Sequence, residues 1–298
     1  MTAPTIAPPH PSPHGPTLFT PPPGACDAHC HVFGPAARFP FADKRAYTPP
    51  DAGLEDFEVL QSRLGLSRAV FVQASCHGTD NRAMVDALHR GRGRYAGVAM
   101  IDEAITDAEL AALHDAGVRG IRFNFVAHLG GAPDLPRFWR IVERISPLGW
   151  HVVLHFDAKD LARYADLFER MPTTYILDHM ARVDATAGLD QEPFQQILGL
   201  LADERCWVKI SGAERLNASG GPPYDEVVPY ARALIAAAPD RILWGTDWPH
   251  PNVRVTPDDG DLVDLLAAYA PDEAIRNRIL VDNPARLYDF ADAPSGPL

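Results

Sequence analysis

The feature that most constrains the fold is a regular alternation of short apolar runs with amphipathic stretches, which continues from Pro23 almost to the C-terminus. The amphipathic stretches place apolar residues three and four positions apart, as helices packed on a core require. The apolar runs predict strands at Ala25–Val32, Arg68–Ala74, Tyr95–Met100, Gly120–Phe125, His151–Phe156, Thr174–Asp178, Trp207–Ser211 and Arg241–Trp244. Eight strands that alternate with helices predict an α/β fold, a (β/α)₈ TIM barrel.

An open, doubly wound sheet is the alternative fold. No glycine-rich G-x-G-x-x-G loop follows the first predicted strand, which disfavours it. The segment Pro271–Phe290 is expected to form one or two closing helices, and no internal repeat is visible. We therefore expect a single barrel domain over residues 24–298, preceded by a separate arm over residues 1–23.

The composition is that of a folded protein with an acidic surface. Of the 298 residues 46% are hydrophobic and 22% charged, with a formal net charge of −12. Nucleic acids and anionic membranes favour basic surfaces, so neither is expected as a partner. A small anion would need a local arginine cluster.

The proline-rich N-terminus, residues 1–23, is expected to form an extended arm on the surface or on a neighbouring subunit of a homo-oligomer. It has neither the basic start nor the continuous apolar core of a signal peptide. No run of 18 apolar residues predicts a membrane span. The four cysteines form no C-x-x-C pair and are expected to be reduced thiols, which favours a cytoplasmic location.

The first predicted strand contains two histidines, His29 and His31, that alternation places on one face. Their positions differ by about 6 to 7 Å along the strand, because a strand rises roughly 3.3 Å per residue. This spacing suits two ligands of one metal ion, two donors to one substrate oxygen, or ordinary surface histidines. Alternation also predicts that Asp178, next to His179, points away from the site, and Asp27 is not included in the ligand set.

Other titratable side chains occur where the predicted strands end. His155 ends the fifth strand, Asp178-His179 the sixth and Asp247 the eighth, while Arg122 lies in the fourth. In a (β/α)₈ barrel the working residues occupy the C-terminal ends of the strands and the loops that follow. The sequence therefore predicts one polar cluster at that end of the barrel.

These residues resemble the pattern of the amidohydrolase superfamily, with its His-x-His on strand one, histidines ending strands five and six, and an aspartate ending strand eight. Longer strings, from Pro21 to Tyr288, resemble the 2-pyrone-4,6-dicarboxylate lactonases of that superfamily: DAHCHVFGP (27–35), VQASCHGTDN (72–81), GIRFNF (120–125), WGTDWPHPN (244–252) and the closing DNPARLY (282–288). The resemblance implies a hydrolase for a flat anionic lactone from bacterial breakdown of aromatic compounds.

The resemblance also implies roles for individual residues. Asp247 and His179 become the catalytic pair, with Asp247 taking a proton from water and His179 orienting or polarising the lactone carbonyl. Arg122 and Arg215 become carboxylate clamps, for which a guanidinium fork is suited. Tyr47 and Ser75 become further substrate contacts. The alternatives are a bridge between strand ends for Arg122, a solvated loop charge for Arg215, and ordinary packing or a turn bond for Tyr47 and Ser75.

Two departures from the lactonase pattern bear on the metal. The pyrone lactonases work without a metal and carry a tyrosine at the end of strand five and a further arginine after strand four. Here these positions hold His155 and His128. A ligand set of His29, His31, His155 and Asp247 would suit Zn²⁺, and the related zinc-dependent 4-sulfomuconolactone hydrolases fit both departures, with His128 as a substrate contact. A metal-free pyrone lactonase and a metal-dependent non-oxidative decarboxylase are the alternatives.

Overall fold

The computed structural model describes residues 3–290 and contains one eight-stranded sheet. The strands are β1 (Cys26–Cys30), β2 (Arg68–Val72), β3 (Tyr95–Ala99), β4 (Val118–Asn124), β5 (His151–His155), β6 (Tyr175–Leu177), β7 (Cys206–Lys209) and β8 (Ile242–Leu243). They are parallel and adjacent in sequence order. Hydrogen bonds from the Ala28 N–H to the Trp244 carbonyl, and from the Asp247 N–H to the His29 carbonyl, join the first strand to the segment after the last. The predicted TIM barrel is confirmed.

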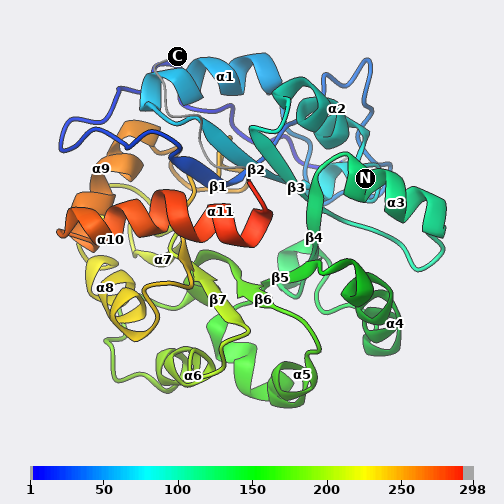
Figure 1. The fold of residues 1–298 in the computed structure, drawn as a ribbon. Coiled ribbons are helices and arrows are strands. Elements are labelled where there is room, and N and C mark those ends of the chain that lie inside the picture. Colours follow the sequence, from blue (N-terminus) through cyan, green and yellow to red (C-terminus); the bar gives the residue numbers. More distant parts are fainter. Residues whose placement is uncertain (1–2, 291–298) are drawn as a thin grey trace.

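Helices surround the strands in a ring (Figure 1). They are α1 (Leu54–Leu64), α2 (Arg82–Gly91), α3 (Asp107–Asp115), α4 (Leu135–Ile145), α5 (Ala165–Arg170), α6 (Glu192–Leu200), α7 (Ala213–Leu216), α8 (Val228–Ala237), α9 (Asp259–Tyr269), α10 (Glu273–Asn277) and α11 (Asn283–Tyr288). The expected closing helices of Pro271–Phe290 are α10, the π-helical turn Arg278–Asp282, and α11. Among the described residues, no helix is both long and apolar enough to cross a membrane.

The core has two layers, as the alternation of side chains in a barrel requires. Outward-facing strand residues such as Phe71 pack against the helices, and Phe71 meets Phe57 of α1. Inward-facing residues of the strands form a second apolar cluster: Cys26, Ala28, Val70, Val72, Ala96, Val98, Val153, Ile176, Trp207 and Leu243. Tyr288 of α11 joins this inner cluster. Helix α11 lies across that end of the barrel (Figure 1). Because the inner apolar cluster and α11 fill this end of the barrel, polar side chains can gather only at the opposite end.

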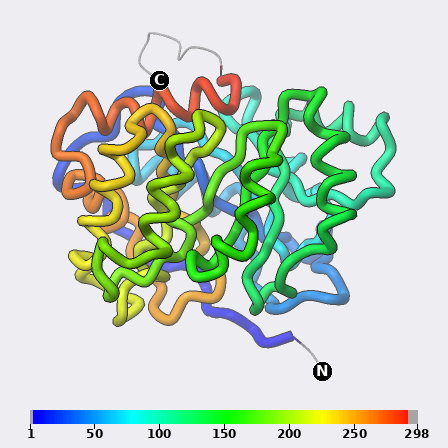
Figure 2. The backbone as a smooth tube through the Cα atoms, turned by 90° about the horizontal axis from the view of Figure 1, so that it is seen from below, coloured from blue at the N-terminus to red at the C-terminus, as the bar shows by residue number. Residues whose placement is uncertain are grey.

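The proline-rich arm lies against the barrel's own loops and α9. The Thr48 N–H donates to the Pro4 carbonyl, and the Ile6 N–H donates to the Thr48 carbonyl. Farther along, the Thr17 N–H and hydroxyl both donate to Asp264 of α9. The first described residues lie at the end of the barrel opposite α11 (Figure 2). Residues 1–2 and 291–298, assigned above to the arm and to the barrel, lie outside the described residues.

The arm's contact with α9 predicts a small pH-dependent stabilisation. His14 Nε2 lies 2.9 Å from Asp261 Oδ1, and a bond to the Gly15 carbonyl and then this carboxylate raise the pKa of His14 to about 9. Because the pKa of His14 is higher in the folded state, the stabilisation by protonated His14 is fully present below the unfolded pKa of about 6.5. It is lost as the pH rises through about 9. We expect His14→Ala to lower Tm slightly near neutral pH and not at about pH 10. Thr17→Val is the matched control, whose effect should not vary with pH; a constant His14→Ala effect would contradict the assignment.

Candidate active site

A bulge in β1 brings His29 and His31 to the inside of the barrel. Cys26 and Ala28 belong to the inner apolar cluster, but Cys30 packs in the outer one. The pairing register of β1 with β2 shifts between Asp27 and Cys30, which changes the parity of the alternation. Asp27, fully buried, accepts hydrogen bonds from the N–H groups of His29 and Thr246 and from the Thr246 hydroxyl. Its carboxylate thereby holds the end of β1 against the segment after β8.

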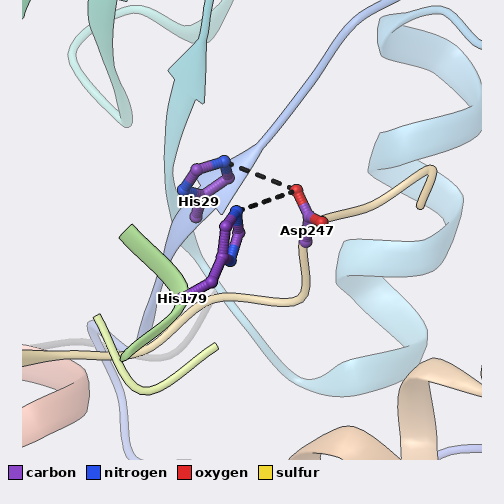
Figure 3. Close-up of side chains that lie close together, drawn as sticks. All are labelled: His29, His179 and Asp247. Carbon is purple, nitrogen blue, oxygen red and sulfur yellow. Dashed lines mark ion pairs between the residues drawn. The ribbon is translucent and has the colours of Figure 1, made fainter. Parts of the chain in front are cut away.

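Asp247 lies at the centre of the site, one residue after Thr246, in the left-handed region with φ of 65°. Its Oδ1 lies 3.1 Å from His31 Nε2, 3.4 Å from His29 Nε2 and 3.9 Å from His179 Nε2. Figure 3 shows the His29 and His179 rings directed toward this carboxylate. All four side chains are buried. The sequence-predicted catalytic pair and two predicted ligands therefore converge on one carboxylate oxygen.

The short helical turn Asp178–Arg182 after β6 does not follow strand alternation. His179, Met180 and Ala181 all have left-handed backbone angles, with φ near 50°. This turn lets His179 reach Asp247 while its Nδ1 lies 2.9 Å from the Ser211 hydroxyl. Asp178 meanwhile faces the barrel interior, 3.2 Å from His29 Nδ1 and 3.2 Å from Arg122 Nε. The expectation that Asp178 points away from the site is wrong. Asp178 lies two residues after the inward-facing Ile176 and so faces inward itself, and the left-handed turn that begins at His179 is what brings this histidine to the same side.

Arg215 lies between two acidic side chains. Its Nε donates to Asp247 Oδ2 at 2.9 Å, its Nη2 donates to the same oxygen, and its Nε also lies 3.3 Å from Glu214 Oε1. Both residues come from the short helix α7, which follows β7. Only 8% of the Arg215 side chain is exposed, so it is not the solvated loop charge of the alternative interpretation. A substrate anion that binds the Nε and Nη2 side of this guanidinium would therefore compete with Asp247 for its donors.

His155 and Arg122 contact each other on the other side of the site. Arg122 Nη2 lies 3.1 Å from His155 Nδ1, and Asn124 Oδ1 lies at the same distance from that nitrogen. His155 Nε2 is buried and has no hydrogen-bond partner in the described part of the chain. The His155 ring centre lies 5.5 Å from that of His179. The structure thus gives His155 a free inward-facing nitrogen next to the histidine cluster.

The three remaining predicted substrate contacts differ in their surroundings. Tyr47 is buried, and its hydroxyl interacts with Ser75 in the turn Ser75–His77 that follows β2. The charge of Arg122 acts on Tyr47. His128 is exposed in the turn Ala127–Leu129, and its ring centre lies 6.3 Å from that of His155. Their contact with a substrate stays a prediction.

Burial and neighbouring charges keep Asp247 ionised and keep the imidazoles of His29, His155 and His179 neutral. Burial alone would raise the pKa of Asp247, but the Arg215 guanidinium outweighs it and holds this pKa well below its usual range. Burial lowers the pKa of His29 to about 3, and it lowers the pKa of His155 and His179 well below the ordinary value. At neutral pH the site therefore contains an ionised Asp247 and the uncharged imidazoles of His29, His155 and His179, each with one N–H donor and one acceptor.

The donor set was tested against a zinc ion. His29, His179 and Asp247 each offer a ligand atom, and these atoms lie within 4.8 Å of one another. Nitrogen and carboxylate ligands of this kind suit Zn²⁺. Within residues 3–290, neither His31 nor His155 is part of this group, so it contains two of the four predicted ligands, His29 and Asp247. The zinc ion and its ligand set stay predictions.

Sequence reasoning missed two residues of the site. Lys209 is fully buried in β7, where its Nζ lies 3.1 Å from His29 Nδ1 and 3.4 Å from Asp178 Oδ1. Glu214 is buried beside Arg215. Lys209 had a visible signal, a single charge between Val208 and Ile210 in a strand expected to be buried on both faces. Glu214 gave no such signal, because a short helix in a loop has no hydrophobic periodicity that a buried glutamate would interrupt.

Comparison with known proteins gives the same assignment over almost the whole chain. Residues 26–290 match the amidohydrolase family. The chain is 49% identical to 2-pyrone-4,6-dicarboxylate hydrolase of Comamonas testosteroni (91% of this chain, 92% of the relative). It is 46% identical to 4-sulfomuconolactone hydrolase of Rhizobium radiobacter (92% of each). A solved structure from Acinetobacter baumannii, described as a probable 2-pyrone-4,6-dicarboxylic acid hydrolase with citric acid bound, is 27% identical with a TM-score of 0.80, covering 90% of this chain and all of the other. The chain therefore belongs to the amidohydrolase family.

Proposed function

We propose that this amidohydrolase opens the ring of a small anionic lactone by hydrolysis, with Asp247 as the general base. One observation carries the proposal: a buried carboxylate has three imidazole nitrogens around Oδ1 and a guanidinium on Oδ2. This is a base surrounded by donors, as ester hydrolysis requires. The relatives named for lactone hydrolysis, and the relative with bound citric acid, support an anionic substrate.

The proposed reaction uses the residues of this chain as follows. An acid group of the substrate takes donors of Arg215 that otherwise bind Asp247, which raises the basicity of that carboxylate. Asp247 removes a proton from a water molecule as the water oxygen attacks the lactone carbonyl carbon. Imidazole N–H groups stabilise the negative charge on the carbonyl oxygen. The ring C–O bond then breaks, and Asp247 returns the proton to the leaving oxygen. Arg122 is proposed to bind a second acid group.

Two substrate classes are candidates. The first is a pyrone dicarboxylate, opened without a metal; it is favoured by the hydrogen bond from Lys209 to His29 Nδ1 and by the relative at 49% identity. The second is a sulfonated muconolactone; it is favoured by the three ligand atoms around Asp247 and by the relative at 46% identity. In the second case a zinc ion held by His29, His179 and Asp247 would supply Lewis-acid polarisation of the ester carbonyl. Decarboxylation of an aromatic acid is the third reaction to be tested.

The test is an assay on both lactones, before and after removal of metal by a chelator, with ring-opened acid and CO₂ measured as separate products. We expect ring-opened acid, no CO₂, and turnover of the pyrone dicarboxylate that survives chelation, because Asp247 and the histidines provide the base and the donors. Loss of activity on chelation and its return with Zn²⁺ would favour the muconolactone. Formation of CO₂, or no turnover of either lactone, would contradict the proposal.

A further inference from the structure

The nitrogen of His29 that faces away from Asp247 has two polar neighbours. One can only donate a hydrogen bond to it, and the other can only accept one from it. His29 Nδ1 lies 3.1 Å from Lys209 Nζ and 3.2 Å from Asp178 Oδ1. All three side chains are fully buried, so no solvent competes for these contacts. An ammonium group can only donate a hydrogen bond, and a carboxylate can only accept one. A neutral imidazole can satisfy one of them at Nδ1, but not both.

The geometry favours the lysine. The contact from Lys209 to Nδ1 has hydrogen-bond geometry, whereas within residues 3–290 neither oxygen of Asp178 has a partner in hydrogen-bond geometry, despite its short distance to His29. Asp178 is instead held by ion pairs to Arg122 and Lys209. If Nδ1 accepts from Lys209, the single proton of the imidazole must be on Nε2, which lies 3.4 Å from Asp247 Oδ1.

We propose that Lys209 is a positioning residue that holds His29 in the tautomer with its proton on Nε2 and thereby disfavours metal binding at this site. A proton on Nε2 makes His29 a donor toward Asp247 or toward a substrate carbonyl. The same proton removes the lone pair that a metal ion would need, since metal ligation by imidazole requires an unprotonated nitrogen. Asp178 has the opposite effect: by accepting a proton from Nδ1 it would free Nε2 for the metal, as the carboxylate partners of metal-bound histidines do.

The inference rests on the proposed function only in taking the Asp247 cluster as the active site. It adds that the balance between Lys209 and Asp178 at one nitrogen determines whether this amidohydrolase site operates with or without a metal. The test therefore measures zinc binding and the position of a proton, and neither readout depends on turnover of any lactone.

The first experiment compares Zn²⁺ affinity, by competition with a chromophoric chelator, in the metal-stripped protein and two variants. Lys209→Met removes the donor at similar length, and we expect it to bind Zn²⁺ at least about tenfold more tightly than the unchanged protein. Asp178→Asn removes the acceptor, and we expect it to bind at least about tenfold more weakly. Ser211→Ala, next to His179 Nδ1, is the matched control: a serine hydroxyl both donates and accepts, so its loss should not tighten binding. Weaker binding in Lys209→Met would overturn the proposal.

The second experiment observes the tautomer directly, by nitrogen NMR of protein labelled at histidine, with the His29 signals assigned by their absence from a His29→Gln spectrum. We expect the unchanged, metal-free protein to have its His29 proton on Nε2, and Lys209→Met to move it to Nδ1. A proton on Nδ1 in the unchanged protein would overturn the proposal even if Lys209→Met does not fold. Tighter zinc binding without a change of tautomer would overturn it as well, because charge repulsion alone would then explain the affinity.

Discussion

Replacing Asp247 by asparagine is expected to lower kcat for lactone opening by about 10³-fold, within the range of about 10²–10⁴ typical of a lost general base. The amide keeps the shape of the carboxylate but cannot take a proton from water. Arg215 retains a carboxylate partner in Glu214, so the fold should survive with a modest loss in Tm. Initial rates at saturating substrate, with circular dichroism of the same preparations, measure both effects.

The matched control for Asp247→Asn is Asp80→Asn. Asp80 pairs with Arg82 on the surface at the start of α2, and it has no contact with the histidine cluster. Its replacement should leave kcat within about twofold of the unchanged protein, as expected for an exposed ion pair. If Asp247→Asn retains more than a tenth of the activity, both the metal-free and the zinc-dependent mechanism are wrong, because both give this carboxylate the central role.

The second large effect is expected for Arg215→Met, in stability as well as in activity. Removal of the guanidinium leaves Asp247 and Glu214 as two buried carboxylates without their shared cation. Breaking a buried ion pair by removing one partner typically costs about 3–5 kcal/mol in the free energy of unfolding. KM for the anionic lactone should rise as well, since a substrate carboxylate loses its bidentate donor. Urea denaturation and steady-state kinetics measure the two losses.

A double mutant separates these two consequences of Arg215→Met. In Arg215→Met combined with Asp247→Asn, one of the two buried charges is gone, so the double variant should be more stable than Arg215→Met alone. Its KM should stay high, because the clamp for the substrate anion is still absent. An Arg215→Met protein of normal stability and normal KM would mean that the guanidinium neither balances Asp247 nor binds substrate.

The histidine cluster illustrates how far a local pattern predicts a site. His29, His31, His179 and Asp247 were named from strand ends and family resemblance, and all four converge within hydrogen-bonding or ion-pair distance. The prediction worked because parallel strands bring their C-terminal ends to one edge, so residue position along the chain translates into position in space. The direction of Asp178 was mispredicted because alternation was counted from His179. Asp178 follows the alternation of β6 from the inward-facing Ile176, whereas His179 lies in a left-handed turn to which strand alternation does not apply.

The sequence by itself determined the barrel and the residues of the histidine–aspartate cluster, His29, His31, His179 and Asp247. Both follow from short-range patterns, namely the alternation of apolar runs with helical periodicity and the polar residues where each run ends. Only the tertiary structure decided which charges meet inside the barrel: that Lys209 of β7 faces His29 of β1, and that Arg215 is shared between Glu214 and Asp247. These contacts join residues up to 180 positions apart. They depend on barrel closure, on the β1 bulge and on loop backbone angles, and no local pattern encodes any of these.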